Sequence, residues 1–239
     1  MADRTVAAAE VDLWWASLRL PPERLARLEA LLTGDERTRA DRFRFARDRA
    51  RFVVARGMLR EILGRYLDRE PAALRFAYGA HGKPALARAS TGLRFNLAHS
   101  GDAALFAVGW GRDVGVDLEP VRADLEIGEL AATVLTPGER ALLAAAPSER
   151  RDELFAALWT RKEALAKATG LGLALPFDRV AVAPLGDLAD WIEPDGPFLG
   201  DRRWSLRSLD VGPGFAAALA VEGDGVEVRD QTTVMPMGM

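Results

Sequence analysis

Short apolar runs, separated by stretches rich in glycine, proline and charged residues, recur along this chain and predict β-strands. The first run covers residues 11–18 and reads VDLWWASL. Further strands are predicted around residues 93–97, 103–109, 114–119, 177–183, 203–209 and 214–221. Residues 226–239 are predicted to form a loose tail.

Other segments place apolar residues every three or four positions, which predicts helices with one buried face. Pro21 and Pro22 open the first helix. Its inner face carries Leu25, Leu28, Leu31 and Leu32. Asp35 is predicted to cap the next helical stretch. A longer pattern follows, with Arg56 and Arg60 off its apolar stripe. That stripe consists of Phe52, Leu59, Ile62, Leu63 and Tyr66.

The second half of the chain contains two further helix signals. The sequence TPGE, which starts at Thr136, is a capping box with proline at the first helical position. A longer helix is predicted from about Ser148 to Thr169, and it ends at Gly170 because glycine tolerates the conformation that closes a helix. Strands and helices mix without strict βαβ alternation and without a convincing internal repeat. This mixture predicts an α+β (mixed α/β) fold.

The composition is that of a folded chain with a substantial core. Of the 239 residues, 49% are hydrophobic, which suits either one large domain or two small ones. No apolar run reaches the ~18–20 residues that a membrane-spanning helix needs, so we expect no membrane partner. The N-terminal MADRTVAAAEVDLWW lacks the features of a secretory signal, and the chain contains no cysteine. The expected location is therefore cytoplasmic.

Arginine is concentrated in one region, although the chain as a whole carries a net charge of −3. Between Glu36 and Arg60, nine arginines stand against three acids. This local surplus predicts an anion-binding surface, and an ordinary solvated helix surface is the alternative. The acidic balance of the whole chain argues against nucleic acid as the partner.

The stretch VGVDLE, residues 114–119, places two acids on one face of a predicted strand. Side chains alternate along a strand, so the three aliphatic residues face one way while Asp117 and Glu119 face the other. The two acidic Cα atoms would lie roughly 6.5–7 Å apart. Two anions at this spacing suit a bound cation, and a solvated acidic face at a sheet edge is the alternative.

A second informative row lies on the predicted helix from Ser148 to Thr169. Its members, four residues apart on one face, are Phe155, Trp159, Glu163 and Lys167. Because the row begins with two large apolar side chains, its charged members are predicted at the edge of the core. A plain surface ion pair is the alternative. With Asp117 and Glu119, Glu163 would complete a set of oxygen ligands that suits Mg²⁺ or Mn²⁺, although spacing alone does not bring strand and helix together.

Two loop segments offer groups that bind phosphate. FNLAHSG, residues 95–101, places His99 and Ser100 at a predicted strand end, where both can donate hydrogen bonds. HGKP, which starts at His81, adds Lys83 on a tight loop. A solvated side chain is the alternative at each position. No G-x-S-x-G pattern accompanies His99, so it is not predicted to be the base of a catalytic triad.

The order of four motifs gives the chain a resemblance to a known family. GKP, FNLAHSG, VGVDLE and LWTRKEALAKATGLGL follow one another between residues 82 and 173. In this order they resemble the 4′-phosphopantetheinyl transferase superfamily, and the full series is similar to its Sfp-type branch. The preceding arginine-rich RFRFARDRARF also fits this resemblance.

The resemblance implies two similar subdomains related by a pseudo-twofold axis, with the active site in the cleft between them. Residues 1–116 would form the N-terminal subdomain, which contacts CoA phosphates. Residues 117–225 would form the C-terminal subdomain, with the metal ligands and the carrier docking surface, and residues 226–239 would be the tail. The implied activity moves the 4′-phosphopantetheine arm of CoA onto a serine of an apo acyl or peptidyl carrier protein. It releases 3′,5′-adenosine bisphosphate and requires Mg²⁺. Because two halves in one chain would complete the site, we expect a monomer, although the sequence leaves the oligomeric state open.

Carried onto this chain, the metal ligands that the resemblance implies are Asp117, Glu119 and Glu163. Glu163 would also take the proton of the carrier serine, directly or through a water. Lys167 would stabilise the charge that develops on the phosphate oxygens and the leaving group. Glu163 and Lys167 are therefore the implied catalytic residues.

The implied contacts to CoA are Lys83, His99 and Lys167, with Arg39, Arg51 and Ser100 as further members of the set. The family commonly has serine directly before the histidine, whereas this chain has Ala98. A hydroxyl contact to CoA is therefore expected to be missing, with Ser100 or backbone amides in its place. We expect this change to alter CoA affinity without abolishing activity.

Segment 120–135, PVRADLEIGELAATVL, is predicted to form part of the carrier docking surface. The residues it would contribute are Ile127, Leu130, Val134 and Leu135. The alternative is that these side chains fill the core of the second subdomain. Two other functions remain open from the residues: a Mg²⁺-dependent phosphohydrolase that uses the same carboxylates, and a non-catalytic CoA- or nucleotide-binding module.

Overall fold

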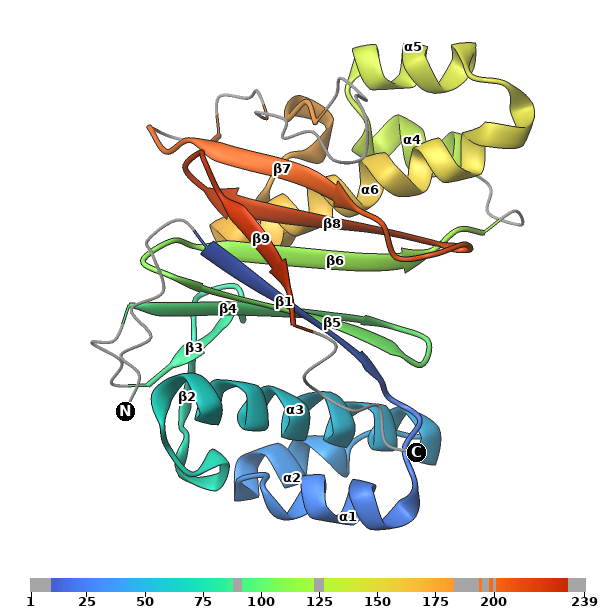
Figure 1. Ribbon diagram of the computed structural model, residues 1–239. Coiled ribbons are helices and arrows are strands. Elements are labelled where there is room, and N and C mark those ends of the chain that lie inside the picture. The colour runs from blue at the N-terminus through green and yellow to red at the C-terminus, as the bar shows by residue number, and fades with distance from the viewer. Residues whose placement is uncertain are drawn as a thin grey trace.

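Helices form the two outer layers of the structure, and strands fill the space between them (Figure 1). The structure, a computed structural model, describes residues 10–87, 92–122, 127–182, 194, 198–199 and 201–231. The arrangement confirms the predicted mixed α/β fold. No helix in these ranges is both long and apolar enough to cross a bilayer.

The first half of the chain packs helices on one face of an antiparallel sheet. Its elements are β1 (Glu10–Ser17), α1 (Pro22–Ala30), α2 (Gly34–Ala40), α3 (Ala46–Leu67), β2 (Phe76–Tyr78), β3 (Pro84–Leu86), β4 (Leu93–Ser100) and β5 (Ala103–Trp110). β5 lies between β4 and β1, while β2 and β3 form a separate hairpin. The apolar stripe of α3, including Leu59 and Ile62, packs against sheet residues such as Phe106.

The second half repeats this plan. Its elements are β6 (Val114–Pro120), α4 (Ile127–Val134), α5 (Pro137–Ala145), α6 (Arg151–Thr169), β7 (Trp204–Leu209), β8 (Phe215–Glu222) and β9 (Glu227–Asp230). In each half one strand is followed by two short helices, a long helix and two antiparallel strands. The last of these, β5 or β8, takes the centre of the sheet. The order of elements is therefore similar in the two halves, although no convincing repeat is visible in the sequence.

A buried glutamate fastens α2 to α3 in the first half. Glu36 accepts the backbone N–H of Thr33 at 2.9 Å in a capping box. The same carboxylate pairs with Arg60 of α3 at 2.7 Å, and neither side chain is more than 2% exposed. Arg60 also donates to the carbonyls of Pro71 and Leu74. Both charges have left water, so each depends on the other and on these hydrogen bonds.

The second half contains an equivalent capping box and buried ion pair at the matching position. Glu139 accepts the backbone N–H of Thr136 at 2.9 Å and pairs with Lys162 of α6 at 2.8 Å. Lys162, which is fully buried, donates to the carbonyls of Phe177 and Val180. Only two or three side chains keep this pattern, which explains why the repeat is invisible in the sequence as a whole.

The structure corrects several local predictions in the first half and at one later strand. Thr33, not Asp35, caps α2, because Asp35 lies inside the first turn. Arg56 and Arg60 are buried beside Glu36 instead of lying on a basic surface. Residues predicted as a strand at 177–183 begin instead with the 3-10 helix Phe177–Arg179, and residue 183 lies outside the described ranges.

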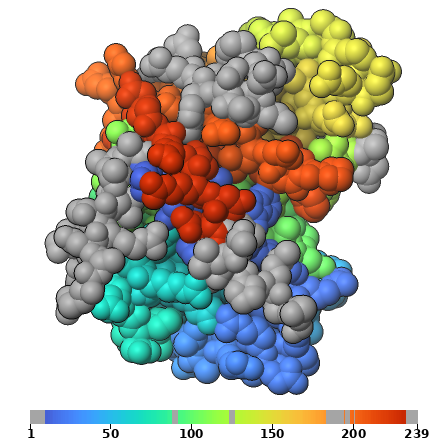
Figure 2. Space-filling view, viewed as in Figure 1, coloured from blue at the N-terminus to red at the C-terminus, as the bar shows by residue number. Residues whose placement is uncertain are grey.

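The predicted tail and domain boundary also change. β9 pairs in parallel with β1, so residues 227–230 belong to the first sheet. Figure 2 shows this red segment on the surface beside blue residues of the first half. Residues 232–239 lie outside the described ranges. The predicted boundary at residue 116 falls inside β6, because the two larger sheets divide the chain between Trp110 and Val114.

We expect Lys162→Met to lower the free energy of unfolding by about 3–5 kcal/mol, because it leaves the buried carboxylate of Glu139 without its cation. Urea unfolding followed by circular dichroism measures this change. Arg203→Met is the control, because Arg203 is exposed and pairs loosely with the exposed Asp224 at 3.7 Å. The control should unfold like the wild type. Equal midpoints for all three proteins would contradict the importance of the buried pair.

Candidate active site

The backbones of β6 and α6 approach each other closely at Gly115. A Cβ atom at this position would lie 2.1 Å from the carbonyl oxygen of Ala164 and 2.3 Å from the amide nitrogen of Ala168. Only glycine permits this approach, since any side chain would overlap the helix backbone. The contact brings the face of β6 that carries Asp117 against the helix that carries Glu163.

Asp117 is the buried centre of the resulting site. Its side chain is 4% exposed, and its Oδ1 accepts a hydrogen bond from Nζ of Lys167 at 2.6 Å. The other oxygen, Oδ2, is buried and has no hydrogen-bond partner among the described residues. Burial raises the pKa of Asp117, and the ammonium group of Lys167 opposes that rise. A buried oxygen without a partner is a free position for a cation.

Glu119 and Glu163 share this environment. Burial is the largest cause that raises the pKa of each, and the negative charge of Asp117 is the second. Glu119 also raises the pKa of Glu163, whereas Lys167 lowers the pKa of both. The three carboxylates therefore interact electrostatically, which spacing in the sequence alone does not establish. Keeping all three ionised is unfavourable unless positive charge is close.

The donor chemistry of these carboxylates fits a hard divalent cation, because such ions prefer oxygen ligands. The unpartnered Oδ2 of Asp117 supports the same conclusion. Within the described parts of the chain, however, no three acidic or histidine side chains already surround one point. Glu119 and Glu163 would have to turn toward Asp117 to complete a ligand set, and the ammonium of Lys167 supplies positive charge there meanwhile.

β4 contributes His99 and Ser100 to the edge of the same site. Burial lowers the pKa of His99, and the positive charges of Lys167 and then Arg51 lower it further, which places all three in one neighbourhood. A hydrogen bond from Ser100 is among the causes that lower the pKa of Glu119. Ala98 is buried between the two sheets, on the face of β4 opposite to His99.

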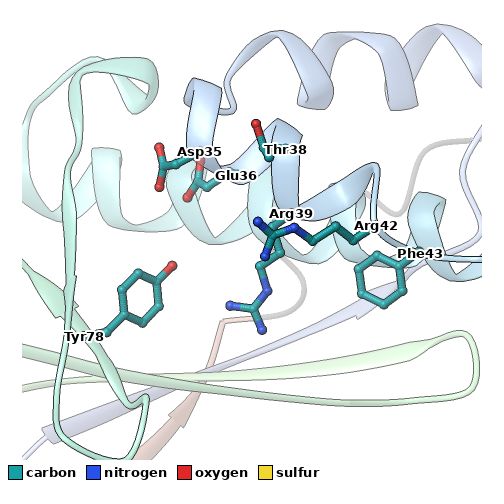
Figure 3. Close-up of a pocket in the computed structure, with 7 residues that line it drawn as sticks. All are labelled: Asp35, Glu36, Thr38, Arg39, Arg42, Phe43 and Tyr78. Carbon is teal, nitrogen blue, oxygen red and sulfur yellow. The ribbon is translucent and has the colours of Figure 1, made fainter.

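The two arginines predicted to help lie in different places. Arg51 donates to Asp102 through Nε at 2.9 Å and Nη2 at 2.7 Å, and through Nη1 to Asp48 at 3.3 Å. Its guanidinium is therefore already shared between two acids. Arg39 lines a separate pocket of about 760 Å³ (Figure 3). The other lining residues, none of them from the carboxylate site, are Asp35, Glu36, Thr38, Arg42, Phe43 and Tyr78.

The ammonium groups of Lys83 and Lys162 bind backbone carbonyls, which their sequence motifs do not predict. Lys83 donates to the backbone carbonyls of Val114 and Ala168, so its ammonium group is engaged within the protein. Its predicted contact with a CoA phosphate stays a prediction. Lys162 directly precedes Glu163 in the helix motif, yet it is fully buried on the far side with Glu139. The four-residue row through Glu163 includes Lys167, which lies in the site, and does not include Lys162.

A groove of about 200 Å³ adjoins Glu119. Its walls are formed by Pro120, Arg122, Ile127, Leu130, Asp152, Phe155, Ala156 and Trp159. Of the predicted docking residues, Ile127 and Leu130 line this groove. Val134 and Leu135 do not, because they are buried in the core of the second half, at 7% and 0% exposure. Residues 123–126 of the predicted docking segment lie outside the described ranges.

Known proteins match this chain over both halves. A family model described as the 4′-phosphopantetheinyl transferase superfamily matches residues 113–220. Another, described as the N-terminal part of 4′-phosphopantetheinyl transferase, matches residues 20–110. The 4′-phosphopantetheinyl transferase HetI of Nostoc sp. is 40% identical over 224 residues, which cover 92% of this chain and 91% of that protein. A 4′-phosphopantetheinyl transferase of Bacillus subtilis is 26% identical over 235 residues, which cover 95% and 94%.

A solved structure of a holo-(acyl-carrier-protein) synthase from Bacillus anthracis aligns with 47% of this chain and 96% of its own. The alignment has a TM-score of 0.41 and 22% sequence identity.

We expect Gly115→Ala to lower the free energy of unfolding by about 1–3 kcal/mol, because the new methyl group forces α6 away from β6. Gly128→Ala is the matched control, since a Cβ at Gly128 in α4 meets nothing within 4 Å. The control should gain up to about 1 kcal/mol from the better helix propensity of alanine. Urea unfolding of both variants tests this contrast. Equal stability of the two would contradict the close contact at Gly115.

Proposed function

The chain belongs to the 4′-phosphopantetheinyl transferase superfamily, and from this membership we propose its reaction: transfer of the 4′-phosphopantetheine arm of CoA to a serine of an apo acyl or peptidyl carrier protein. The other product would be 3′,5′-adenosine bisphosphate. One observation carries the proposal, namely that the β6–α6 contact joins Asp117, Glu163 and Lys167 in one site.

We assign the metal ligands of this reaction to Asp117, Glu119 and Glu163. Their oxygen atoms and the unpartnered Oδ2 of Asp117 support Mg²⁺, or Mn²⁺ in its place. When bound, the ion would neutralise the pyrophosphate of CoA and polarise the phosphorus under attack. The raised pKa of each carboxyl group is consistent with a site that holds positive charge when it works.

Glu163 is the proposed proton acceptor for the carrier serine. The serine oxygen forms a bond to the phosphorus that bears pantetheine, and the bond from that phosphorus to the oxygen of the nucleotide phosphate breaks. The serine proton passes to Glu163, directly or through a water. Burial and the neighbouring Asp117 raise the pKa of Glu163, which makes its carboxylate a stronger base than an exposed glutamate.

Lys167 and His99 are the proposed contacts to the phosphates of CoA. Lys167 already directs its ammonium group into the site, where it would stabilise negative charge on the leaving phosphate. Burial and the nearby cations lower the pKa of His99, and its ring would donate a hydrogen bond to a CoA phosphate. Arg51 would have to share its guanidinium with Asp102, and Arg39 would bind a more distant part of CoA in its own pocket.

The groove beside Glu119 is the proposed docking position of the carrier protein. Ile127, Leu130 and Trp159 give it an apolar wall, and Arg122 adds a positive charge suited to an acidic partner. Its place next to a metal ligand would bring the carrier serine to the carboxylate site. We propose that the chain works as a monomer, since both halves of the fold come from one chain.

The proposed reaction predicts that an apo carrier protein, incubated with this protein, CoA and Mg²⁺, gains the mass of one phosphopantetheine. Glu163→Gln should slow this gain by about 100-fold or more, because it removes the proton acceptor and one metal ligand. The matched control is Glu149→Gln, because Glu149 is exposed and lies before α6. This variant should transfer phosphopantetheine at the wild-type rate.

Intact-mass spectrometry distinguishes the alternatives. Release of phosphopantetheine without a carrier would indicate a phosphohydrolase. Binding of CoA without any transfer, over several carrier types, would indicate a binding module and would contradict the proposed enzyme.

The docking proposal predicts that Ile127→Glu raises the KM for the carrier by about tenfold, equivalent to about 1.4 kcal/mol of lost binding. A negative charge in the groove would repel an acidic partner, while the KM for CoA stays unchanged. Leu142→Glu on α5 is the control, because Leu142 is 45% exposed and does not line the groove. Steady-state kinetics with each substrate varied in turn test this, and equal carrier KM values for both variants would place docking elsewhere.

A further inference from the structure

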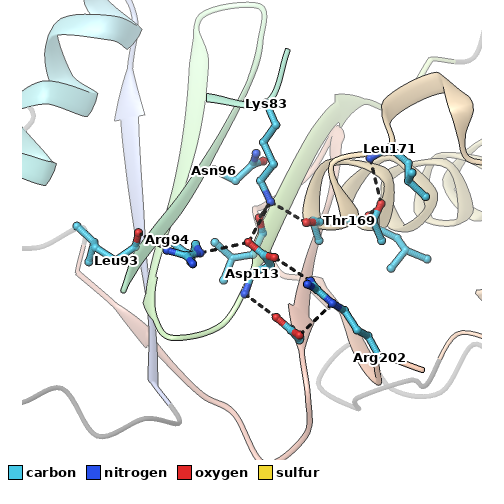
Figure 4. A network of polar contacts seen from close by, with 12 residues as sticks. Lys83, Leu93, Arg94, Asn96, Asp113, Thr169, Leu171 and Arg202 are labelled. Carbon is cyan, nitrogen blue, oxygen red and sulfur yellow. Dashed lines mark hydrogen bonds and ion pairs between the residues drawn. The ribbon is translucent and has the colours of Figure 1, made fainter. Parts of the chain in front are cut away.

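The side chain of Lys83 connects the β2–β3 hairpin to both elements that carry the proposed active site (Figure 4). Its Nζ donates to the carbonyl of Ala168 at 2.6 Å, near the end of α6. It also donates to the carbonyl of Val114 at 3.2 Å, where β6 begins. One ammonium group from the first half thus binds the helix with Glu163 and the strand with Asp117.

The carbonyl of Ala168 is a natural acceptor for this group. The last carbonyls of a helix have no partner within the helix, and they form its negative end. α6 ends at Thr169, and Gly170 turns the chain away in the left-handed conformation with φ of 74°. The stem of Lys83 follows this turn, because a Cβ added at Gly170 would lie 3.6 Å from its Cδ. Lys83 therefore closes the C-terminal end of α6.

A cluster of charges holds Lys83 in this position. Its side chain is 20% exposed, and Asp113 lies 3.8 Å from its Nζ. Asp113 also contacts Arg94 at 3.5 Å and Arg202 at 3.0 Å, so strand β4 and the residues before β7 meet at this carboxylate. Burial lowers the pKa of Lys83, while Asp113 opposes that effect. The ammonium group is thus enclosed by acceptors of the protein itself.

We propose that Lys83 is a positioning residue, which holds the end of α6 against β6 and so sets the spacing between Glu163 and the two acids of β6. This inference rests on the proposed function of that carboxylate site. A contact from Lys83 to a CoA phosphate would require its ammonium group to leave both carbonyls. The two roles predict different effects of the same substitution.

Lys83→Met keeps the length of the stem and removes the charge. We expect kcat to fall at least tenfold, with the KM for CoA within twofold of wild type, because displacement of ligand-bearing elements reduces activity by about 10–100-fold. We also expect faster hydrogen exchange of the backbone amides of the last turn of α6, measured without CoA or carrier. Arg203→Met, on an exposed side chain, should change neither quantity.

Asp113→Asn provides a second variant, since it keeps Lys83 and removes its anion. It should lower kcat and speed hydrogen exchange at the end of α6, each by less than Lys83→Met does. If Lys83→Met does not fold, Asp113→Asn decides by the same criteria. A raised KM for CoA with unchanged kcat and unchanged exchange would overturn the proposal and make Lys83 a phosphate contact. Absence of transfer by the wild type would refute the proposed function. The hydrogen-exchange measurement would still test whether Lys83 stabilises the end of α6.

Discussion

The close contact between β6 and α6 at Gly115 is the constraint on which the candidate site depends. No side chain separates the two backbones, so Asp117 and Glu163 lie close enough for the charge of Asp117 to raise the pKa of Glu163. In the sequence, 45 residues lie between them. Lys167 then reaches Asp117 from the same helix. A site built on a strand and a helix is more rigid than one built on loops, which suits a reaction that requires exact placement of phosphates.

Both halves contain an equivalent buried ion pair, yet among the described residues the second half gathers the carboxylates of Asp117, Glu119 and Glu163 in one site. The sequence VDL occurs in β1 and again in β6, and the glutamates after Arg60 and Lys162 also match. In the first half the equivalent acids are already satisfied: Asp12 accepts from the hydroxyl of Tyr66, and Glu61 pairs with Arg24. A tryptophan stands where the second half has Glu119. In the second half, by contrast, Oδ2 of the equivalent Asp117 has no hydrogen-bond partner among the described residues.

Some features could be predicted because they follow from a few neighbouring residues. The capping box at Thr136, the alternation in VGVDLE and the four-residue row on α6 each depend on local geometry, and each is present in the structure. Predictions failed where a distant partner decided the outcome. The sequence pattern predicts Arg60 at the surface, whereas in the structure Glu36 and two backbone carbonyls bind it in the core. The strand β9 forms because β1 offers a free edge.

The sequence by itself determined the identity of the family and the residue types of the site, because motifs and side-chain periodicity are properties of the chain alone. Only the tertiary structure decided which charges are available for chemistry. Of the three lysines, Lys83 and Lys162 bind backbone carbonyls, whereas Lys167 faces Asp117. The physical reason is that a charged group must find partners when it leaves water, and the fold alone determines which partners lie within reach.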